Sequence, residues 1–487
     1  MAGLIGGMLH SWRQSVPFIA FFSACLSSFP LHAQLSPAQR EDIGFTALQN
    51  LLGASMPTGA GVSVTQVEAL ESGSYRPDSS AFVGKSFSFL SGGNSSISSH
   101  ATTVGQFLYG TSGIASDMGS SASSASIAVY DAANWLGSGF LNTGTPSLLP
   151  IVETRPIQNH SWIGSTSNTT LDTEILRRFD YMLARDNVFA AVGVNNGSAN
   201  SLPALLGQSH NALAVGLSSG DHSAGSTTLD GSGRTKPDIV VPTTATSYAT
   251  PTVAGAGALL LQTARANASL SNASESVVLR SLLLAGASKE EPEFTRPWAH
   301  SESAPLDTLY GAGELDLKTS FDILSGGKFA SSTGSLASER GWDFGSAFVA
   351  DPGVYFFDLT SDAGPISLTA SLVWNSVVSA ADTNPDPSIT AYSFSTIVPN
   401  LNLRLYSATG FAMGSQIAAS LSTVDNLELI YAKDLSSGRY ALSVSSDTDS
   451  VNYGLAWTAS VPEPSSLLLL SVAAIFLLRF RNSRQSV

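Results

Sequence analysis

The apolar positions of this chain follow two different patterns in its two halves. In the first half, longer stretches with helical spacing separate short continuous apolar runs. The runs that predict buried strands are residues 61–67, 127–130, 188–192, 213–217 and 239–241. Helical spacing predicts helices over residues 171–184 and about 275–285. Strands that alternate with helices predict a parallel α/β sheet with helices covering both faces.

From about residue 328 to 460 the apolar residues alternate with polar ones. Leu401, Leu403 and Leu405 share one face of a strand. Two further strands have the same alternation at residues 440–444 and 453–457. Short alternating strands separated by Gly, Asp and Ser turns predict an antiparallel β-sandwich, expected to serve packing or substrate docking. Residues 424–428 and 438–440 resemble parts of a known type of jelly-roll domain, which implies a jelly-roll-like arrangement.

Both ends of the chain carry segments typical of targeting signals. Arg13, the apolar run 16–26 and the small-residue end at Ala33 predict a signal peptide over residues 1–33. Cys25, the one cysteine of the chain, lies within it, so the mature protein is expected to contain no disulfide. Lipidation of Cys25 is the alternative.

These patterns divide the chain into four segments. The signal peptide occupies residues 1–33, the α/β domain 34–326, the β-sandwich domain 327–460 and a C-terminal segment 461–487.

The C-terminal segment has three parts. Residues 461–464 read Val-Pro-Glu-Pro, an apolar run spans 467–478, and three arginines follow it. This order resembles the PEP-CTERM sorting signal of Gram-negative bacteria. The resemblance implies recognition by an exosortase at the membrane, followed by cleavage. A plain C-terminal membrane anchor is the alternative. Either one predicts an exported protein of the cell envelope, the cell surface or the medium.

The composition narrows the range of partners. The net charge is −14 and only 12 % of the residues are charged, which argues against nucleic-acid binding. The chain has neither the zinc spacing HExxH nor a phosphate-binding loop, so no cofactor is expected. Residues 382–386 could hold a structural calcium ion through oxygen ligands, or form a polar turn.

One stretch, residues 233–264, points to chemistry. An apolar helix is expected from about Pro251 to Ala264, and Ser247 lies just before its N-terminus. Pro251 suits a first helical turn, because no donor is lost there. Gly255 and Gly257 predict close packing against a neighbouring backbone. The amides at the helix start would favour negative charge beside Ser247, although a serine there is commonly only a cap.

The sequence of this stretch resembles a motif of a known protein family. KPDIVVP followed by ATSYATPTVAGAGALL is similar to the serine segment of the subtilisin-like serine proteases, with Ala245 in place of their glycine. Residues 99–105 resemble the family's histidine segment, HGTHVAG, and strand 61–67 aligns with the strand that ends in its aspartate. The resemblance implies Ser247 as nucleophile, His100 as base and Glu68, in the aspartate position, as the acid that orients His100.

Two further segments resemble parts of this family. Residues 188–197 are similar to AAAGNxG, which implies that Asn195, with the Ser247 amide, holds the oxyanion. Asn196 is the fallback, and a simple Asn-Asn-Gly turn is the alternative. Residues 159–164 resemble the segment that pairs with an extended peptide substrate, which implies substrate-binding roles for residues of this region. The implied substrate-binding residues are Ser161, Trp162 and Gly193.

Together these features predict an exported serine endopeptidase that acts on peptides or proteins. The chain departs from the family at Glu68, Ala101, Ile163 and in an extra residue near Asn195. These departures support the alternative, a catalytically impaired surface binding or matrix protein of the same fold.

Overall fold

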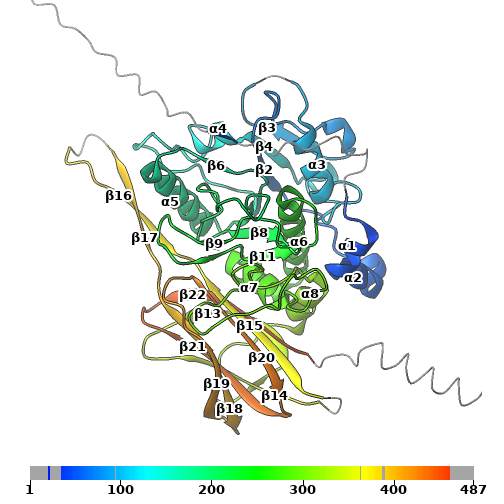
Figure 1. The fold of residues 1–487 in the computed structure, drawn as a ribbon, viewed down its shortest axis with the longest axis vertical. Helices are drawn as coiled ribbons and strands as arrows, with labels where there is room; N and C mark the ends of the chain where they lie inside the picture. The colour runs from blue at the N-terminus through cyan, green and yellow to red at the C-terminus, as the bar shows by residue number, and fades with distance from the viewer. Residues whose placement is uncertain (1–19, 22–33, 94, 362–363, 387–389, 461–487) are drawn as a thin grey trace, which may run out of the picture.

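The computed structural model describes residues 20–21, 34–93, 95–361, 364–386 and 390–460. An α/β half and a β-rich half follow one another along the long axis of the molecule (Figure 1). The predicted signal peptide, apart from residues 20–21, and the predicted C-terminal membrane segment lie outside the described residues. No helix within the described ranges has the length and apolar character needed to cross a membrane.

The α/β half is built on a seven-stranded sheet with the order β11-β8-β7-β5-β2-β4-β3. All of its neighbouring strands run parallel, which confirms the predicted sheet. The central strands β2, β7 and β8 are buried at every position, and for this reason they appear as continuous apolar runs in the sequence. The strands are β2 (Val64–Glu68), β3 (Phe87–Phe89), β4 (Ile127–Asp131), β5 (Ile157–His160), β7 (Phe189–Gly193), β8 (Leu213–Leu217) and β11 (Ile239–Val241).

Helices cover both faces of this sheet. On β7, Phe189 and Ala191 join the core beneath α3, α6 and α7, whereas Ala190 and Val192 join the core beneath α4 and α5. Helix α2 packs against α8, and α1 packs against α2. Leu48 of α2 and Ile43, the residue after α1, belong to the first of these cores. The helices are α1 (Pro37–Asp42), α2 (Phe45–Leu52), α3 (Ser99–Leu108), α4 (Ala132–Leu136), α5 (Thr169–Asp186), α6 (Thr246–Ala266), α7 (Ser276–Gly286) and α8 (Leu317–Gly326).

The helix that carries Ser247 starts earlier than the sequence predicted. Helix α6 begins at Thr246, so Pro251 lies inside it and Ser247 is its second residue. Pro251 removes one backbone hydrogen bond, but residues 246–261 are all buried, and this packing outweighs the lost bond. Both glycines are closely packed, but against neighbouring side chains and not, as predicted, against a neighbouring backbone. A Cβ at Gly255 would lie 2.7 Å from Ile114, and one at Gly257 would lie 2.6 Å from the Phe189 ring.

The second half is a sandwich of two sheets, which confirms the predicted fold class. One sheet has the order β12-β14-β21-β18-β19 and the other β13-β22-β15-β20. Only the short pair β12–β14 is parallel. The alternating apolar residues of β18, β21 and β22 fill the space between the sheets. The strands are β12 (Leu336–Ala337), β13 (Arg340–Ala347), β14 (Gly353–Leu359), β15 (Ile366–Trp374), β18 (Leu401–Thr409), β19 (Ala412–Ser420), β20 (Leu427–Leu435), β21 (Gly438–Ser446) and β22 (Val451–Ser460).

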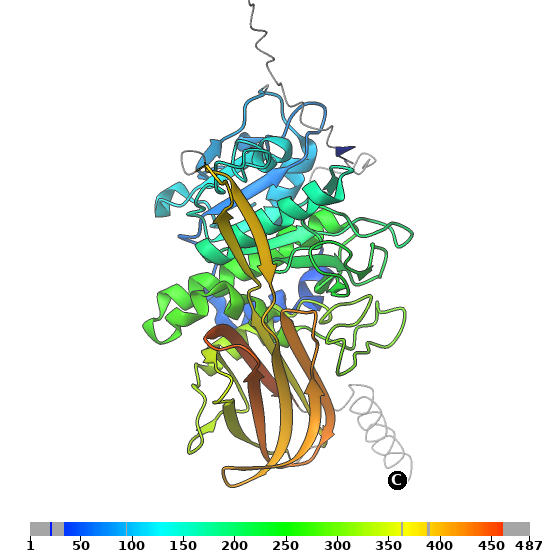
Figure 2. The same ribbon diagram turned by 90° about the vertical axis from the view of Figure 1, so that its left-hand side faces the viewer.

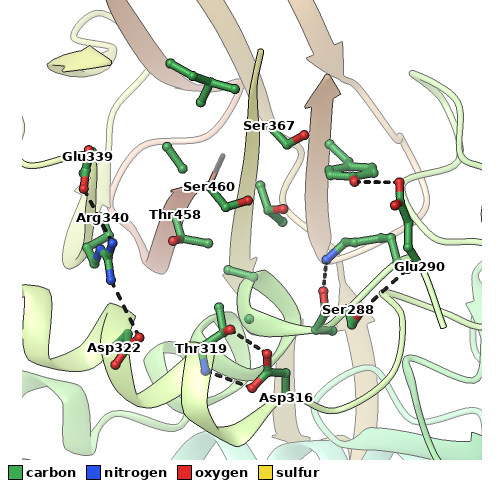
Figure 3. Close-up of a pocket in the computed structure, with 18 of the residues that line it drawn as sticks. Ser288, Glu290, Asp316, Thr319, Asp322, Glu339, Arg340, Ser367, Thr458 and Ser460 are labelled. Atoms are coloured by element: carbon green, nitrogen blue, oxygen red, sulfur yellow. Dashed lines mark hydrogen bonds and ion pairs between the residues drawn. The ribbon is translucent and has the colours of Figure 1, made fainter. Parts of the chain in front are cut away.

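The two halves are packed together at helix α7. Strands β15 and β22 lie against this helix, and a Cβ at Gly454 would meet the carbonyl oxygen of Val277 at 2.5 Å. Beside this contact lies a polar cavity of about 600 Å³, lined by side chains of both halves (Figure 3). Arg340 there lies 3.7 Å from Asp322 and 3.5 Å from Glu339. None of the predicted site residues lines this cavity.

A long hairpin leaves the sandwich and lies along α5 (Figures 1 and 2). It consists of β16 (Val377–Asp382) and β17 (Tyr392–Ile397). The Phe394 ring packs edge-on against Tyr181, and the guanidinium of Arg178 lies 4.5 Å from the Phe394 ring centre. At the far end, Asp382 Oδ1 accepts bonds from the N–H groups of Asn384 and Ala391, as a polar turn requires. A calcium site there stays a prediction.

The remaining short strands pair outside these sheets. Strand β1 pairs with β6, and β9 pairs with β10. Their bounds are β1 (Ala20–Phe21), β6 (Gly164–Ser165), β9 (Gly225–Ser226) and β10 (Thr235–Lys236).

The segment between α7 and α8 contains a buried acid. Glu314 is 1 % exposed, and within the described residues neither carboxylate oxygen has a hydrogen bond of good geometry. Burial, opposed by the nearby Ser218 hydroxyl and assisted by the charges of Glu291, Glu293 and Asp42, raises the pKa of Glu314 to about 8. Glu314 is therefore held neutral in the folded protein at neutral pH.

This burial predicts a loss of stability with rising pH. The unfolded chain ionises Glu314 near pH 4.5 and the folded chain near pH 8. The stability that the neutral form contributes is complete below pH 4.5 and is lost as the pH rises to 8. At about 1.36 kcal/mol per pKa unit, the loss is up to about 5 kcal/mol. We expect Glu314→Gln to remove most of this pH dependence, measured by urea unfolding at pH 4.5 and pH 8.

Glu302→Gln, at an exposed glutamate, is the matched control and should unfold like the wild type at both pH values. An unchanged pH dependence in Glu314→Gln would show that Glu314 is not the group responsible.

Candidate active site

The carboxyl ends of the parallel strands form a small cleft of about 60 Å³. Ligands of open parallel sheets commonly bind at this edge. Every predicted site residue except Glu68 lines it. These residues are His100, Ser161, Trp162, Gly193, Asn195 and Ser247, and they are joined by Ala69, Ile163, Val194, Asn196 and Thr246.

Glu68 lies behind the cleft and is bound to His100. Glu68 is the last residue of β2 and is fully buried, and His100 is the second residue of α3. His100 Nδ1 lies 2.8 Å from Glu68 Oε2, and the imidazole is 12 % exposed. Because a carboxylate only accepts hydrogen bonds, Nδ1 carries the proton of this bond. Nε2 is therefore the nitrogen that can accept a proton from a reacting group.

A second acid, which the sequence did not point to, caps the histidine helix. Glu71 Oε2 accepts bonds from the Ser98 hydroxyl at 2.8 Å and the His100 N–H at 2.9 Å, and Glu71 Oε1 accepts one from the Ser99 hydroxyl at 2.8 Å. A carboxylate is favoured at a helix N-terminus. Glu71 follows a strand and caps a helix much later in the chain, so no local pattern predicted this contact.

His100 differs electrostatically from the other histidines. Burial lowers its pKa, but the charge and hydrogen bond of Glu68 and the charge of Glu71 outweigh burial and raise it above 6.5. Among the five histidines within the described ranges, the other four have lowered pKa values, chiefly through burial. These are His160 (about 3), His210, His222 (about 4) and His300. His100 is thus the histidine that holds a proton most readily.

The helices that carry Ser247 and His100 pack against each other. The Tyr248 ring stacks on Phe107 of α3, with ring centres 4.8 Å apart and planes 6° from parallel. Ser247 is 8 % exposed. Its N–H lies in the first turn of α6, where amides have no acceptor within the helix. Ser247 and His100 therefore line the same cleft.

The two asparagines of the Asn-Asn-Gly turn both reach the cleft but are held differently. Asn195 exchanges hydrogen bonds with Ser223 through its backbone N–H and C=O. Asn196 instead uses its side chain: Oδ1 accepts bonds from the Thr246 N–H at 2.8 Å and the Thr246 hydroxyl at 3.0 Å. This ties the amide of Asn196 to the residue before Ser247 and leaves Nδ2 as its donor end.

The predicted substrate-binding residues come from β7 and from the segment after β5. Ser161 Oγ accepts a bond from Asn159 Nδ2 at 3.0 Å, and Trp162 is 5 % exposed. Gly193 ends β7, where an added Cβ would lie 3.2 Å from the Thr250 hydroxyl. Ile163 also lines the cleft. Two bulky side chains therefore border a cleft with little free volume.

A group of residues with metal-binding character lies elsewhere, among Asp180, His210 and Asp230. Arginines occupy the positions around it. Arg234 Nη1 lies 2.5 Å from His210 Nε2, and Arg177 Nε lies 2.6 Å from Asp230 Oδ1. Because guanidinium groups already supply the positive charge, this cluster is a buried ionic network.

Residues 460–484 match the family described as the PEP-CTERM protein-sorting motif. The predicted sorting signal is therefore confirmed. The motif marks exported proteins of Gram-negative bacteria that are processed at the C-terminus for the cell envelope or surface, which also confirms the predicted location.

Three solved structures are similar to part of the chain. The prenylagaramide maturation protease PagA is 19 % identical and covers 57 % of this chain and 99 % of its own, with a TM-score of 0.40. A serine-to-alanine mutant of the protease domain of PatA is 17 % identical, and the match covers 56 % of this chain and 98 % of that domain, with a TM-score of 0.37. A protease of Pseudoalteromonas arctica is 13 % identical, and the match covers 57 % of this chain and 94 % of that protease, with a TM-score of 0.34. No curated protein matches the chain.

Proposed function

We propose that this protein is an exported serine endopeptidase that hydrolyses peptide bonds at the cleft lined by His100 and Ser247. The observation that carries the proposal is the 2.8 Å bond between His100 Nδ1 and the buried Glu68 carboxylate. It leaves Nε2 as the proton-accepting nitrogen of a histidine that lines the same cleft as Ser247, the second residue of α6. An acid, an imidazole and a hydroxyl in this order are the groups that nucleophilic serine catalysis needs.

The proposed reaction proceeds in two halves. Ser247 Oγ attacks the peptide carbonyl carbon while His100 Nε2 takes the hydroxyl proton, and Glu68 stabilises the imidazolium that forms. His100 then donates this proton to the leaving amine, which leaves an acyl group on Ser247. Water, activated by His100 in the same way, hydrolyses the acyl group and restores the hydroxyl.

We propose Asn196, the fallback of the sequence alignment, as the side-chain donor to the oxyanion, together with the Ser247 N–H. Its amide is fixed by two bonds to Thr246, and a preorganised donor is worth more than a mobile one. We expect Asn196→Ala to lower kcat by about 10² to 10³ with little change in KM, measured on a fluorogenic peptide.

Asn195→Ala is the matched variant, with an expected loss in kcat below about tenfold, because its backbone holds it in place. A larger loss at Asn195 than at Asn196 would return the donor role to Asn195.

The substrate of the proposed enzyme is an extended segment of a peptide or protein. Ser161, Trp162 and Ile163 line the cleft, and strand addition along this segment would bind the substrate main chain. Trp162 and Ile163 leave little room, so they would favour small side chains next to the cleaved bond. The C-terminal motif makes an exosortase-type sorting machinery the expected second partner.

A fluorophosphonate probe tests the proposal, because it reacts only with an activated serine hydroxyl. We expect labelling of the folded protein, mapped by mass spectrometry to the peptide that contains Ser247. Ser276→Ala, which removes another buried serine at a helix start, should leave labelling unchanged. Folded protein that is not labelled would support the catalytically impaired binding protein instead.

A further inference from the structure

A chain of buried polar side chains stands behind Glu68, on the side away from the cleft. Gln66 Nε2 donates to Glu68 Oε1 at 2.8 Å and to the Ala101 carbonyl oxygen at 3.0 Å. The Tyr109 hydroxyl donates to Gln66 Oε1 at 2.5 Å. Gln66, Glu68 and Tyr109 are all 0 % exposed. Both oxygens of Glu68 are therefore held, one by His100 and the other by Gln66.

In each of these hydrogen bonds, the chemistry of the partner atoms fixes which group donates and which accepts. The two groups facing Gln66 Nε2 are acceptors only, a carboxylate and a carbonyl, so the amide cannot be flipped without placing oxygen against oxygen. On the other side, burial raises the pKa of Tyr109 well above its ordinary value, and the charge of Glu68 raises it further. Tyr109 therefore keeps its proton and remains the donor to Gln66.

These hydrogen bonds restrict a glutamate side chain that is longer than the aspartate expected at this position. Glutamate has one more rotatable bond than aspartate, so its carboxylate loses more freedom when it is held against His100. Residues 66 and 68 point to the same side of β2, which places the Gln66 amide beside the carboxylate. The same amide binds Ala101, the neighbour of His100, and so ties the acid to the histidine helix.

We propose that Gln66, itself held by Tyr109, is a positioning residue that fixes the Glu68 carboxylate for its bond to His100. Its effect on turnover rests on the proposed function, whereas its effect on His100 does not. Without Gln66, one buried carboxylate oxygen would lack its donor and Glu68 would rotate away from Nδ1. His100 would then lose the partner that favours its protonated form.

The test replaces Gln66 by Met, which is similar in length but cannot hydrogen-bond. We expect kcat to fall by about 10- to 100-fold with KM within twofold, because the acid acts on the transition state and not on binding. We also expect the acidic limb of the kcat/KM profile to move to lower pH. Tyr109→Phe should act in the same direction but more weakly, because the ring keeps its packing against Phe82.

Gln158→Met is the matched control, since Gln158 is a fully buried glutamine on the neighbouring strand β5 that binds Glu153 instead of Glu68. It should leave kcat and the pH profile unchanged. A double mutant separates positioning from general damage. If Gln66 acts through Glu68, Gln66→Met adds no further loss to Glu68→Ala, whereas a full additional loss would overturn the proposal.

The His100 pKa, measured by NMR titration of its ring, gives a readout that needs no turnover. We expect a lower His100 pKa in Gln66→Met and Tyr109→Phe than in the wild type. An unchanged pKa in both variants overturns the positioning role, and Tyr109→Phe decides the matter if Gln66→Met does not fold. A wild type that shows the pKa effect but no fluorophosphonate labelling would instead overturn the proposed function alone.

Discussion

Ser247→Ala is expected to lower kcat for a fluorogenic peptide by on the order of 10⁶. The substitution removes the oxygen that, in the proposed mechanism, forms a bond to the substrate, and neither His100 nor a bound water can replace it in that position. The fold should tolerate the change, because alanine is the best helix former and Ser247 is the second residue of α6. Peptide hydrolysis and the thermal unfolding midpoint are the two measurements.

Ser276→Ala serves as the control, since it removes a buried hydroxyl from the first residue of α7 without touching the cleft. It should retain full activity. If Ser247→Ala kept even a tenth of the wild-type rate while folding normally, hydrolysis would have to use another nucleophile, and the proposed mechanism would fail.

Glu68→Ala is expected to lower kcat by about 10⁴, because His100 then loses its carboxylate partner. Without that bond the imidazole can rotate, and the positive charge that forms on it during proton transfer is no longer compensated. Glu68→Asp should keep or raise the activity, since it retains the negative charge that compensates the imidazolium. The kcat values of the three proteins on one peptide make the comparison.

The order of these three kcat values tests the role of Glu68. Equal activity in wild type, Glu68→Asp and Glu68→Ala would remove Glu68 from the mechanism. The acid limb of the rate profile provides an independent check. Glu68 is one of the two acids that raise the His100 pKa, so the limb of Glu68→Ala should lie at lower pH than that of the wild type.

Much of the fold could be predicted because burial leaves a local trace in the sequence. Strands buried on both faces appear as short apolar runs, and strands buried on one face alternate. The predicted run 213–217 is strand β8 with the same bounds, and Leu401, Leu403 and Leu405 all point into the sandwich core. The start of α6 was missed because Pro251 is a local signal for a first turn, whereas the burial of residues 246–261 is not local.

The sequence by itself determined the two kinds of sheet, the sorting motif and the residues that line the cleft, because each leaves a pattern within a few neighbouring residues. Only the tertiary structure decided that Glu71 caps the histidine helix, that Gln66 and Tyr109 hold Glu68 from behind and that Asn196 is tied to Thr246. It also placed the β16–β17 hairpin against α5. These contacts join residues from separate strands, helices and loops, and the geometry of a hydrogen bond between them exists only once the core has packed.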